Sequence, residues 1–158
     1  MGNQQERLIW LAGFIDGEGY LGIKKVRRAN PYSGYQLTAR IVISNTSENA
    51  LAFLEGILKE NGVPYRIKYP RIEKHWKPAF QIEIECFKPV SKLLNLVRHY
   101  LVVKAQQADI LLAFIERRQK ACRAAQNSRY TATDIMSWQQ IKELNKVPSE
   151  TIRQNASA

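Results

Sequence analysis

Two acidic residues close an otherwise apolar helix near the start of the sequence. Residues 8–19 read Leu-Ile-Trp-Leu-Ala-Gly-Phe-Ile-Asp-Gly-Glu-Gly, with apolar side chains recurring at helical spacing. The stretch ends in Asp16 and Glu18, although the helix dipole disfavours negative charge at a helix C-terminus. A bound cation would remove that conflict. The simpler alternative is a buried helix that stops at glycine and leaves two solvated acids.

Two glycines lie on one face of the same predicted helix. Gly13 and Gly17 are four residues apart, and small residues at this spacing let two helix backbones approach closely. A glycine in a helix interior costs roughly 1 kcal/mol relative to alanine. The pair therefore indicates close packing of this helix against another backbone.

The segment Leu11-Ala12-Gly13-Phe14-Ile15-Asp16-Gly17-Glu18-Gly19 resembles the nine-residue signature of the LAGLIDADG homing endonucleases. The motif occurs once, which is similar to the homodimeric branch of that family. The resemblance implies that two copies of the motif helix, residues 8–18, pack against each other at the dimer axis. It implies a dimer interface made by Leu11, Ala12, Gly13 and Asp16.

The resemblance also implies which residues carry the chemistry. Glu18 matches the family's metal-binding acid and Gly17 the position whose carbonyl faces the metal, with Mg²⁺ as cofactor and Mn²⁺ as a substitute. Lys104 matches a basic residue near the attacking water. Asn45 matches a polar residue that organises water, although it departs from the usual glutamine and is equally suited to capping a helix. Asp16 matches a mainly structural position.

The chain carries a large excess of positive charge. Among 158 residues, 24 Lys and Arg outnumber 14 Asp and Glu, which gives a net charge of +10 and a pI near 9.8. This surplus favours a polyanionic partner, nucleic acid first. The alternatives are a charge that serves solubility or a ribosomal-type protein. The length suits a single domain with a real core over residues 1–158.

The cysteines and apolar runs exclude other classes of protein. Cys86 and Cys122 are too few and too far apart for a disulfide framework or a Cys-x-x-Cys metal site. We expect two reduced thiols in an intracellular protein that is not secreted. No apolar run approaches the ~18 residues of a membrane span, so no membrane partner is expected.

The periodicity predicts an α+β chain in the order α-β-β-α-β-β-α with extra C-terminal helices. We expect one antiparallel sheet with helices on one face and a polar opposite face, and the family resemblance implies a saddle shape. After the motif helix, the predicted strands cover about 20–28, 35–45, 64–70 and 79–87, and the predicted helices cover 45–61, 89–100, 105–121 and 134–145. Asn45 and Glu48 are spaced as a capping box, and a flexible polar tail covers 147–158.

The polar face of the predicted sheet has side chains suited to reading bases in the major groove. Arginine and lysine can donate to guanine, glutamine can pair with adenine, and glutamate can accept from cytosine N4. The alternative is an ordinary solvated sheet face. The candidate DNA contacts are Lys24, Val26, Arg28, Gln36, Thr38, Arg40, Arg66, Lys68, Gln81 and Glu83, with Lys146 and Ser149 near the C-terminus.

Together these observations predict a homodimeric, site-specific homing endonuclease of the kind that is intron-encoded or encoded within an intein. It would hydrolyse one phosphodiester in each strand of a long, pseudo-palindromic double-stranded DNA target, with Mg²⁺. Two alternatives remain open: an RNA maturase that assists the splicing of intron RNA, and a DNA-binding protein that has lost cleavage.

Overall fold

The computed structural model describes residues 2–29, 33–69, 78–123 and 129–146. The predicted α+β order is confirmed, because two strand pairs each follow a helix and further helices end the chain. The elements are α1 (Gln4–Glu18), β1 (Gly19–Arg27), β2 (Tyr35–Asn45), α2 (Glu48–Glu60), β3 (Arg66–Lys68), β4 (Phe80–Glu85), α3 (Phe87–Val97), the 3₁₀ turn η1 (Arg98–Tyr100), α4 (Ala105–Arg123) and α5 (Ala132–Leu144).

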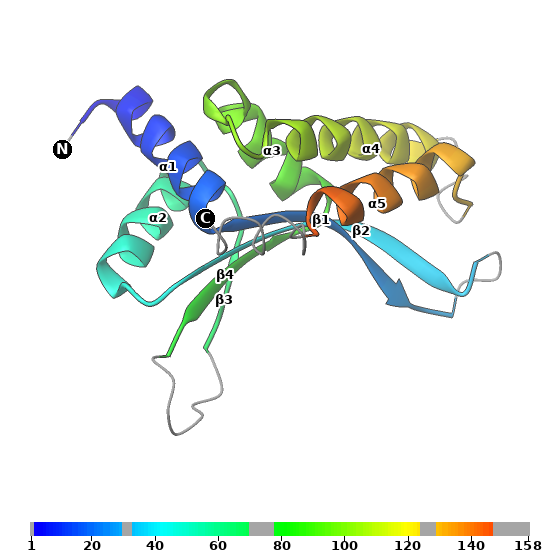
Figure 1. Cartoon of the computed structure of the whole chain (residues 1–158), viewed down its shortest axis with the longest axis horizontal. Helices are drawn as coiled ribbons and strands as arrows, with labels where there is room; N and C mark the ends of the chain where they lie inside the picture. Colours follow the sequence, from blue (N-terminus) through cyan, green and yellow to red (C-terminus); the bar gives the residue numbers. More distant parts are fainter. Residues whose placement is uncertain (1, 30–32, 70–77, 124–128, 147–158) are drawn as a thin grey trace, which may run out of the picture.

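The four strands form one antiparallel sheet in the order β1-β2-β4-β3. All five α-helices lie on one face of it, and the β1–β2 and β3–β4 pairs diverge on the other side as two arms (Figure 1). In the described part of the chain, no helix covers the polar open face between these arms. The predicted saddle with helices on one face is therefore confirmed.

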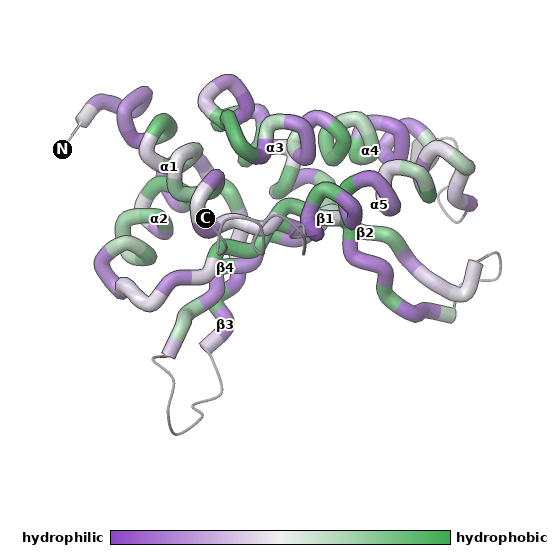
Figure 2. The backbone as a smooth tube through the Cα atoms, viewed as in Figure 1, coloured by the Kyte–Doolittle hydropathy of each residue, from purple (hydrophilic) through white to green (hydrophobic). Residues whose placement is uncertain are grey.

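The core lies between the helices and the sheet, where the hydrophobic segments of the tube gather (Figure 2). It is built from alternate residues of the strands and one stripe of each helix, as the period-2 and period-3.6 patterns require. Representative fully buried side chains are Leu11, Ile15, Ile41, Ile84 and Phe114.

Several predicted boundaries differ from the structure. Helix α2 is capped by Ser47, whose hydroxyl accepts the N–H of Ala50 at 3.3 Å. Asn45 stands outside the helix and its Oδ1 accepts the N–H of Ser47 at 2.8 Å. The predicted capping box of Asn45 and Glu48 is therefore wrong. Helix α3 begins before Pro89, which is tolerated in the first turn because N–H groups there have no helical partner.

The C-terminal helix supports the β1–β2 arm. Lys25 places its ammonium 4.9 Å from the ring of Trp138 on α5 and 4.1 Å from the ring of Tyr35. At the end of α5, Asn145 Nδ2 donates to the Leu21 carbonyl at 2.8 Å. These contacts fix the arm against the helices while its other face stays open. None of the helices in the described part of the chain is both long and apolar enough to cross a bilayer.

Candidate active site and nucleic-acid interface

Asp16 joins the end of α1 to the start of α4. Its carboxylate accepts the backbone N–H groups of Val102 at 2.7 Å, Val103 at 3.1 Å and Lys104 at 2.8 Å. Burial acts to raise the pKa of Asp16, but these three hydrogen bonds and the nearby Lys104 lower it below its ordinary value overall. The acid that conflicts with the α1 dipole is thus stabilised at the N-terminal end of another helix.

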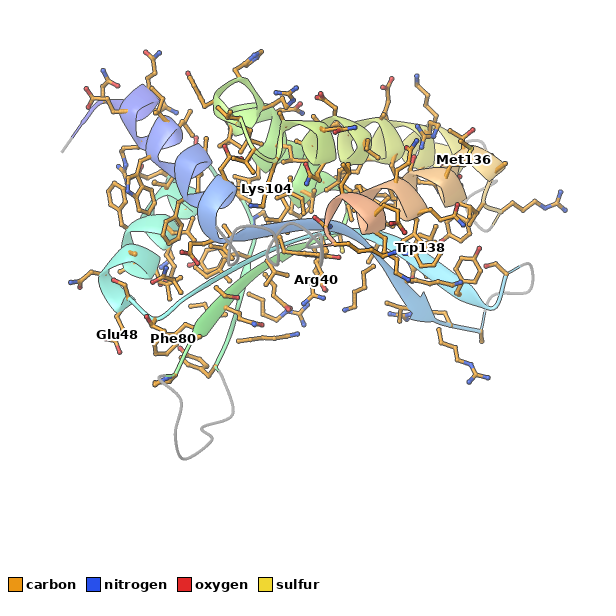
Figure 3. The ribbon with its side chains drawn as sticks, in the orientation of Figure 1. Arg40, Glu48, Phe80, Lys104, Met136 and Trp138 are labelled. Carbon is orange, nitrogen blue, oxygen red and sulfur yellow. The ribbon has the colours of Figure 1, made fainter. Side chains whose placement is uncertain are left out.

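Lys104 reaches back to the same place. Its ammonium donates a hydrogen bond to the backbone carbonyl of Asp16, and its half-buried side chain lies between the end of α1 and the neighbouring helices (Figure 3). A carbonyl in the last turn of a helix has no helical donor, so Lys104 satisfies one of these groups. Asp16 and Lys104 therefore hold each other beside Gly17 and Glu18.

Glu18 ends α1 with an exposed side chain, and no hydrogen bond or ion pair among the described residues engages its carboxylate. Gly17 is also exposed, and its carbonyl belongs to the last helical turn. The described ranges contain no group of three His, Cys, Asp or Glu side chains arranged for a metal ion. One carboxylate and one carbonyl are hard oxygen ligands that fit Mg²⁺, which keeps water and phosphate oxygens as its other ligands.

Asn45 lies at the end of β2 near the same end of α1. The register pairs Gly19 with Ile43, so Asn45 stands two residues past the start of β1. Its Oδ1 is engaged by the N–H of Ser47, and no contact in the described residues joins it to Glu18 or Lys104. Its water-organising role stays a prediction.

One side of α1 is exposed and small. Apart from α1's own backbone, no described atom lies within 4 Å of a Cβ built at Gly13 or Gly17, and Ile9, one turn earlier, is 48% exposed. Beside them, Asp16 holds the loop that carries Val102 and Val103, which are 81% and 70% exposed. We call Ile9, Gly13, Gly17, Val102 and Val103 the α1 patch.

The burial of α1 corrects part of the predicted dimer interface. Leu11 and Ala12 are 0% exposed in the chain's own core, so their side chains are not available to a partner. Gly13 faces outward as predicted, and Asp16 is half-buried. The exposed residues Ile9, Val102 and Val103 lay outside the sequence prediction, because only the fold brings the 102–103 loop beside α1.

Four predicted DNA contacts are paired with two acids on the open face of the sheet. The Glu83 carboxylate binds Arg40 and, at 2.9 Å, Lys68. The Glu85 carboxylate binds Lys24 and Arg66, each at 3.1 Å, and lies 3.6 Å from Arg40 Nε. We call these six residues the acidic network. Figure 3 shows Arg40 pointing away from the helices.

The acidic network changes the role of Glu83. Its side chain is only 1% exposed and lies beneath Arg40 and Lys68, so the predicted contact with cytosine N4 is wrong. Burial acts to raise the pKa of Glu83, whereas hydrogen bonds from Lys68 and Arg40 bring it below the ordinary value. The sequence placed these residues on one face, but their pairing depends on the β2–β4 and β3–β4 registers.

The other predicted DNA contacts lie in different surroundings. On the open face, Gln36 is exposed, whereas Val26, Thr38 and Gln81 are half-buried. The sequence-based contacts gave no role to Tyr20, which is 44% exposed and covers Gly22 on the same face. Further out, Arg28 is exposed near the β1–β2 arm tip, Lys146 pairs with Glu143 at 2.6 Å, and Ser149 lies outside the described residues.

Comparison with known proteins gives a consistent result. The family described as LAGLIDADG endonuclease matches residues 11–116. The chain is 28% identical to DNA endonuclease I-CreI of Chlamydomonas reinhardtii over 156 residues, covering 94% of this chain and 88% of that protein.

Solved structures share the fold at lower identity. The archaeal intron-encoded homing endonuclease I-Vdi141I complexed with DNA matches with a TM-score of 0.71 and 15% identity, over 92% of this chain and 88% of that one. The homing endonuclease I-CvuI, solved with the I-CreI target in 2 mM Mg with DNA not cleaved, matches with a TM-score of 0.67 and 17% identity, over 93% and 87%.

Proposed function

The chain belongs to the LAGLIDADG endonuclease family, and we propose that it acts as a homodimeric homing endonuclease that hydrolyses both strands of a specific DNA target with Mg²⁺. The observation that carries this proposal is the arrangement at the end of α1. There Glu18 lies two residues after Asp16, which Lys104 contacts. The Glu18 side chain is exposed, and its carboxylate makes no hydrogen bond or ion pair among the described residues. A carboxylate that is free to bind a metal ion, beside a lysine ammonium held in place, suits phosphodiester hydrolysis.

Each residue at this end of α1 has a distinct task in the proposal. Glu18 and the Gly17 carbonyl would hold Mg²⁺, which supplies charge to the scissile phosphate and lowers the pKa of the attacking water. Lys104 would stabilise negative charge that develops on the phosphate oxygens. Asp16 keeps Lys104 in place through the three backbone hydrogen bonds. Asn45 would orient the attacking water.

The α1 patch supports the homodimer. A single chain contains one motif and therefore one Glu18, whereas cleavage of two strands needs two such sites. A two-fold interface brings the same surface of both subunits together, and the absence of side chains at Gly13 and Gly17 lets two α1 backbones meet. Two-fold symmetry in the protein calls for matching half-sites in the DNA.

The open face of the sheet supports recognition of double-stranded DNA. A two-stranded ribbon fits the major groove, which is about 12 Å wide, and the two arms offer such ribbons. The net charge of +10 suits a phosphate backbone. Relatives are consistent with this assignment, since I-CreI is a DNA endonuclease and I-Vdi141I was solved with DNA.

The experiment compares wild type with Glu18→Gln on plasmids carrying the uninterrupted form of the sequence that flanks the gene. Glutamine keeps the shape but removes the charge, so cleavage of both strands in Mg²⁺ should be lost while binding in Ca²⁺ survives. The matched control is Glu116→Gln, which should cleave normally. Glu116 is an exposed acid on α4 that pairs with Lys120. Wild-type cleavage by Glu18→Gln would refute the assignment.

Intron RNA is the second substrate in the same assay. Splicing assistance by the wild type, without DNA cleavage, would favour a maturase. Binding of duplex DNA without cleavage would favour a DNA-binding protein that has lost its activity.

A further inference from the structure

Glu83 occupies an unusual position for a carboxylate. It lies on β4, opposite Val42 of β2 and Arg66 of β3, in the interior of the sheet. Its side chain is 1% exposed, and the Oε2 atom is buried with no hydrogen bond among the described residues. Burying a carboxylate is costly unless it is well paired, and an acid under a surface that meets phosphates adds repulsion. The pairing of Glu83 with Arg40 offers a reason for placing a carboxylate there.

Arg40 is held on one side of its guanidinium group by a hydrogen bond at Nη2 and an ion pair at Nε, although the buried Nε makes no hydrogen bond. Its Nη2 donates to Glu83, and its Nε lies 3.6 Å from Glu85 Oε1. Nη1 and the second hydrogen of Nη2 have no acceptor among the described residues. These two nitrogens form the fork that binds guanine O6 and N7 together. The arginine is thus already oriented in the free protein, which reduces the side-chain entropy lost on binding.

We propose that Glu83 is a positioning residue for base recognition, which holds Arg40 so that it selects guanine at one symmetric pair of positions in the DNA target. This inference rests on the proposed function and deepens it. Glu83 makes no contact with the DNA itself. It acts by fixing the arginine fork, and its effect should therefore appear in base preference.

The test measures binding to a target library in which each base pair is varied in turn, in Ca²⁺ so that cleavage is suppressed. Glu83→Gln should lower the preference for guanine at one symmetric pair of positions by roughly tenfold, within the range of one bidentate contact. The other positions should keep their preferences. Affinity for unrelated DNA should rise, because each subunit loses one negative charge.

Two further variants separate orientation from charge. Glu83→Asp keeps the charge but withdraws the carboxylate by one methylene, so guanine preference should fall without a gain in affinity for unrelated DNA. Arg40→Lys keeps the charge but removes the fork, and it should lose preference at the same positions. Glu116→Gln makes the same charge change on α4, away from the sheet, and should leave base preference unchanged.

The outcomes distinguish this inference from the proposed function. If wild type binds its target and both Glu83 variants keep the wild-type base preferences, the positioning role is refuted. Should Glu83→Gln fail to fold, as judged by circular dichroism, the charge-conserving Glu83→Asp decides alone. If wild type binds no duplex DNA, the proposed function fails first.

Discussion

Replacing Asp16 by asparagine tests whether one carboxylate holds α1 against the start of α4. The N–H groups of Val102 and Val103 share Oδ2, whereas that of Lys104 uses Oδ1. Asparagine keeps one oxygen, so its best orientation accepts the first two donors and turns its NH₂ towards the third. The variant therefore loses one hydrogen bond outright and loses the charge that strengthens the other two.

The expected loss follows from these contacts. A hydrogen bond to a charged group contributes about 1.5–3 kcal/mol, and a neutral one about 0.5–1.5 kcal/mol. Water offsets part of this loss, because Val102 and Val103 are exposed. We expect the free energy of unfolding to fall by about 2 kcal/mol. Asp109→Asn, which removes an exposed pair with Arg98, is the control and should cost about 0–1 kcal/mol.

The assay is urea unfolding at a fixed protein concentration, since the proposed association of two chains would contribute to stability. The folded-state pKa of Asp16 lies below the ordinary value of 3.8, so its contribution is fully present above about pH 5. It is lost as the pH falls through the folded-state pKa. The advantage of wild type over Asp16→Asn should therefore shrink in acid. A difference below about 0.5 kcal/mol at pH 7, or one independent of pH, would contradict the reasoning.

Three other changes test separate parts of the structure. A Cβ built at Gly13 meets nothing within 4 Å outside the helix's own backbone, so a folded monomer should accept Gly13→Leu; we expect this change to abolish the proposed dimer in sedimentation experiments, and a stable dimer would refute the α1 interface. Cys86→Gly should raise stability by about 1 kcal/mol, because Cys86 has a φ of 78° that favours glycine; a lower melting temperature would contradict this. Lys104→Met should slow cleavage with little effect on metal affinity, and equal cleavage rates would exclude a role for its charge.

The well-predicted parts of the fold have uninterrupted patterns. Strand β2 spans Tyr35–Asn45, as its alternation predicts, because both of its neighbours pair along it. Strand β3 spans only Arg66–Lys68, although the sequence alternates further. It stops pairing at Arg66 although its single neighbour β4 continues past Glu83 to Glu85, and nothing in the alternating residues of β3 encodes that limit. The start of α2 was misplaced because Asn45 and Ser47 are both good capping residues.

In the candidate site, too, the sequence reveals local patterns but not contacts between distant segments. Glu18 could be proposed from the sequence because the motif is contiguous. The hydrogen bonds from residues 102–104 to Asp16 join segments more than 85 positions apart, and no local pattern reports them. Likewise, the sequence indicated a polar sheet face, but only the register shows that Glu83 lies between Arg40 and Lys68.

The acidic network suggests how a strongly basic protein can still discriminate among DNA sequences. Its four cations and two carboxylates leave a net charge of +2 where the sheet would meet base edges. Specificity is a difference between affinities, and charge attracts every phosphate equally. In our proposal, acids at the centre of the open face would weaken that uniform attraction and would orient the donors that distinguish bases. Meanwhile Arg27 and Arg28, exposed near the end of the β1–β2 arm, remain available to hold the backbone. The proposal therefore places base recognition and phosphate-backbone contact on different parts of one sheet.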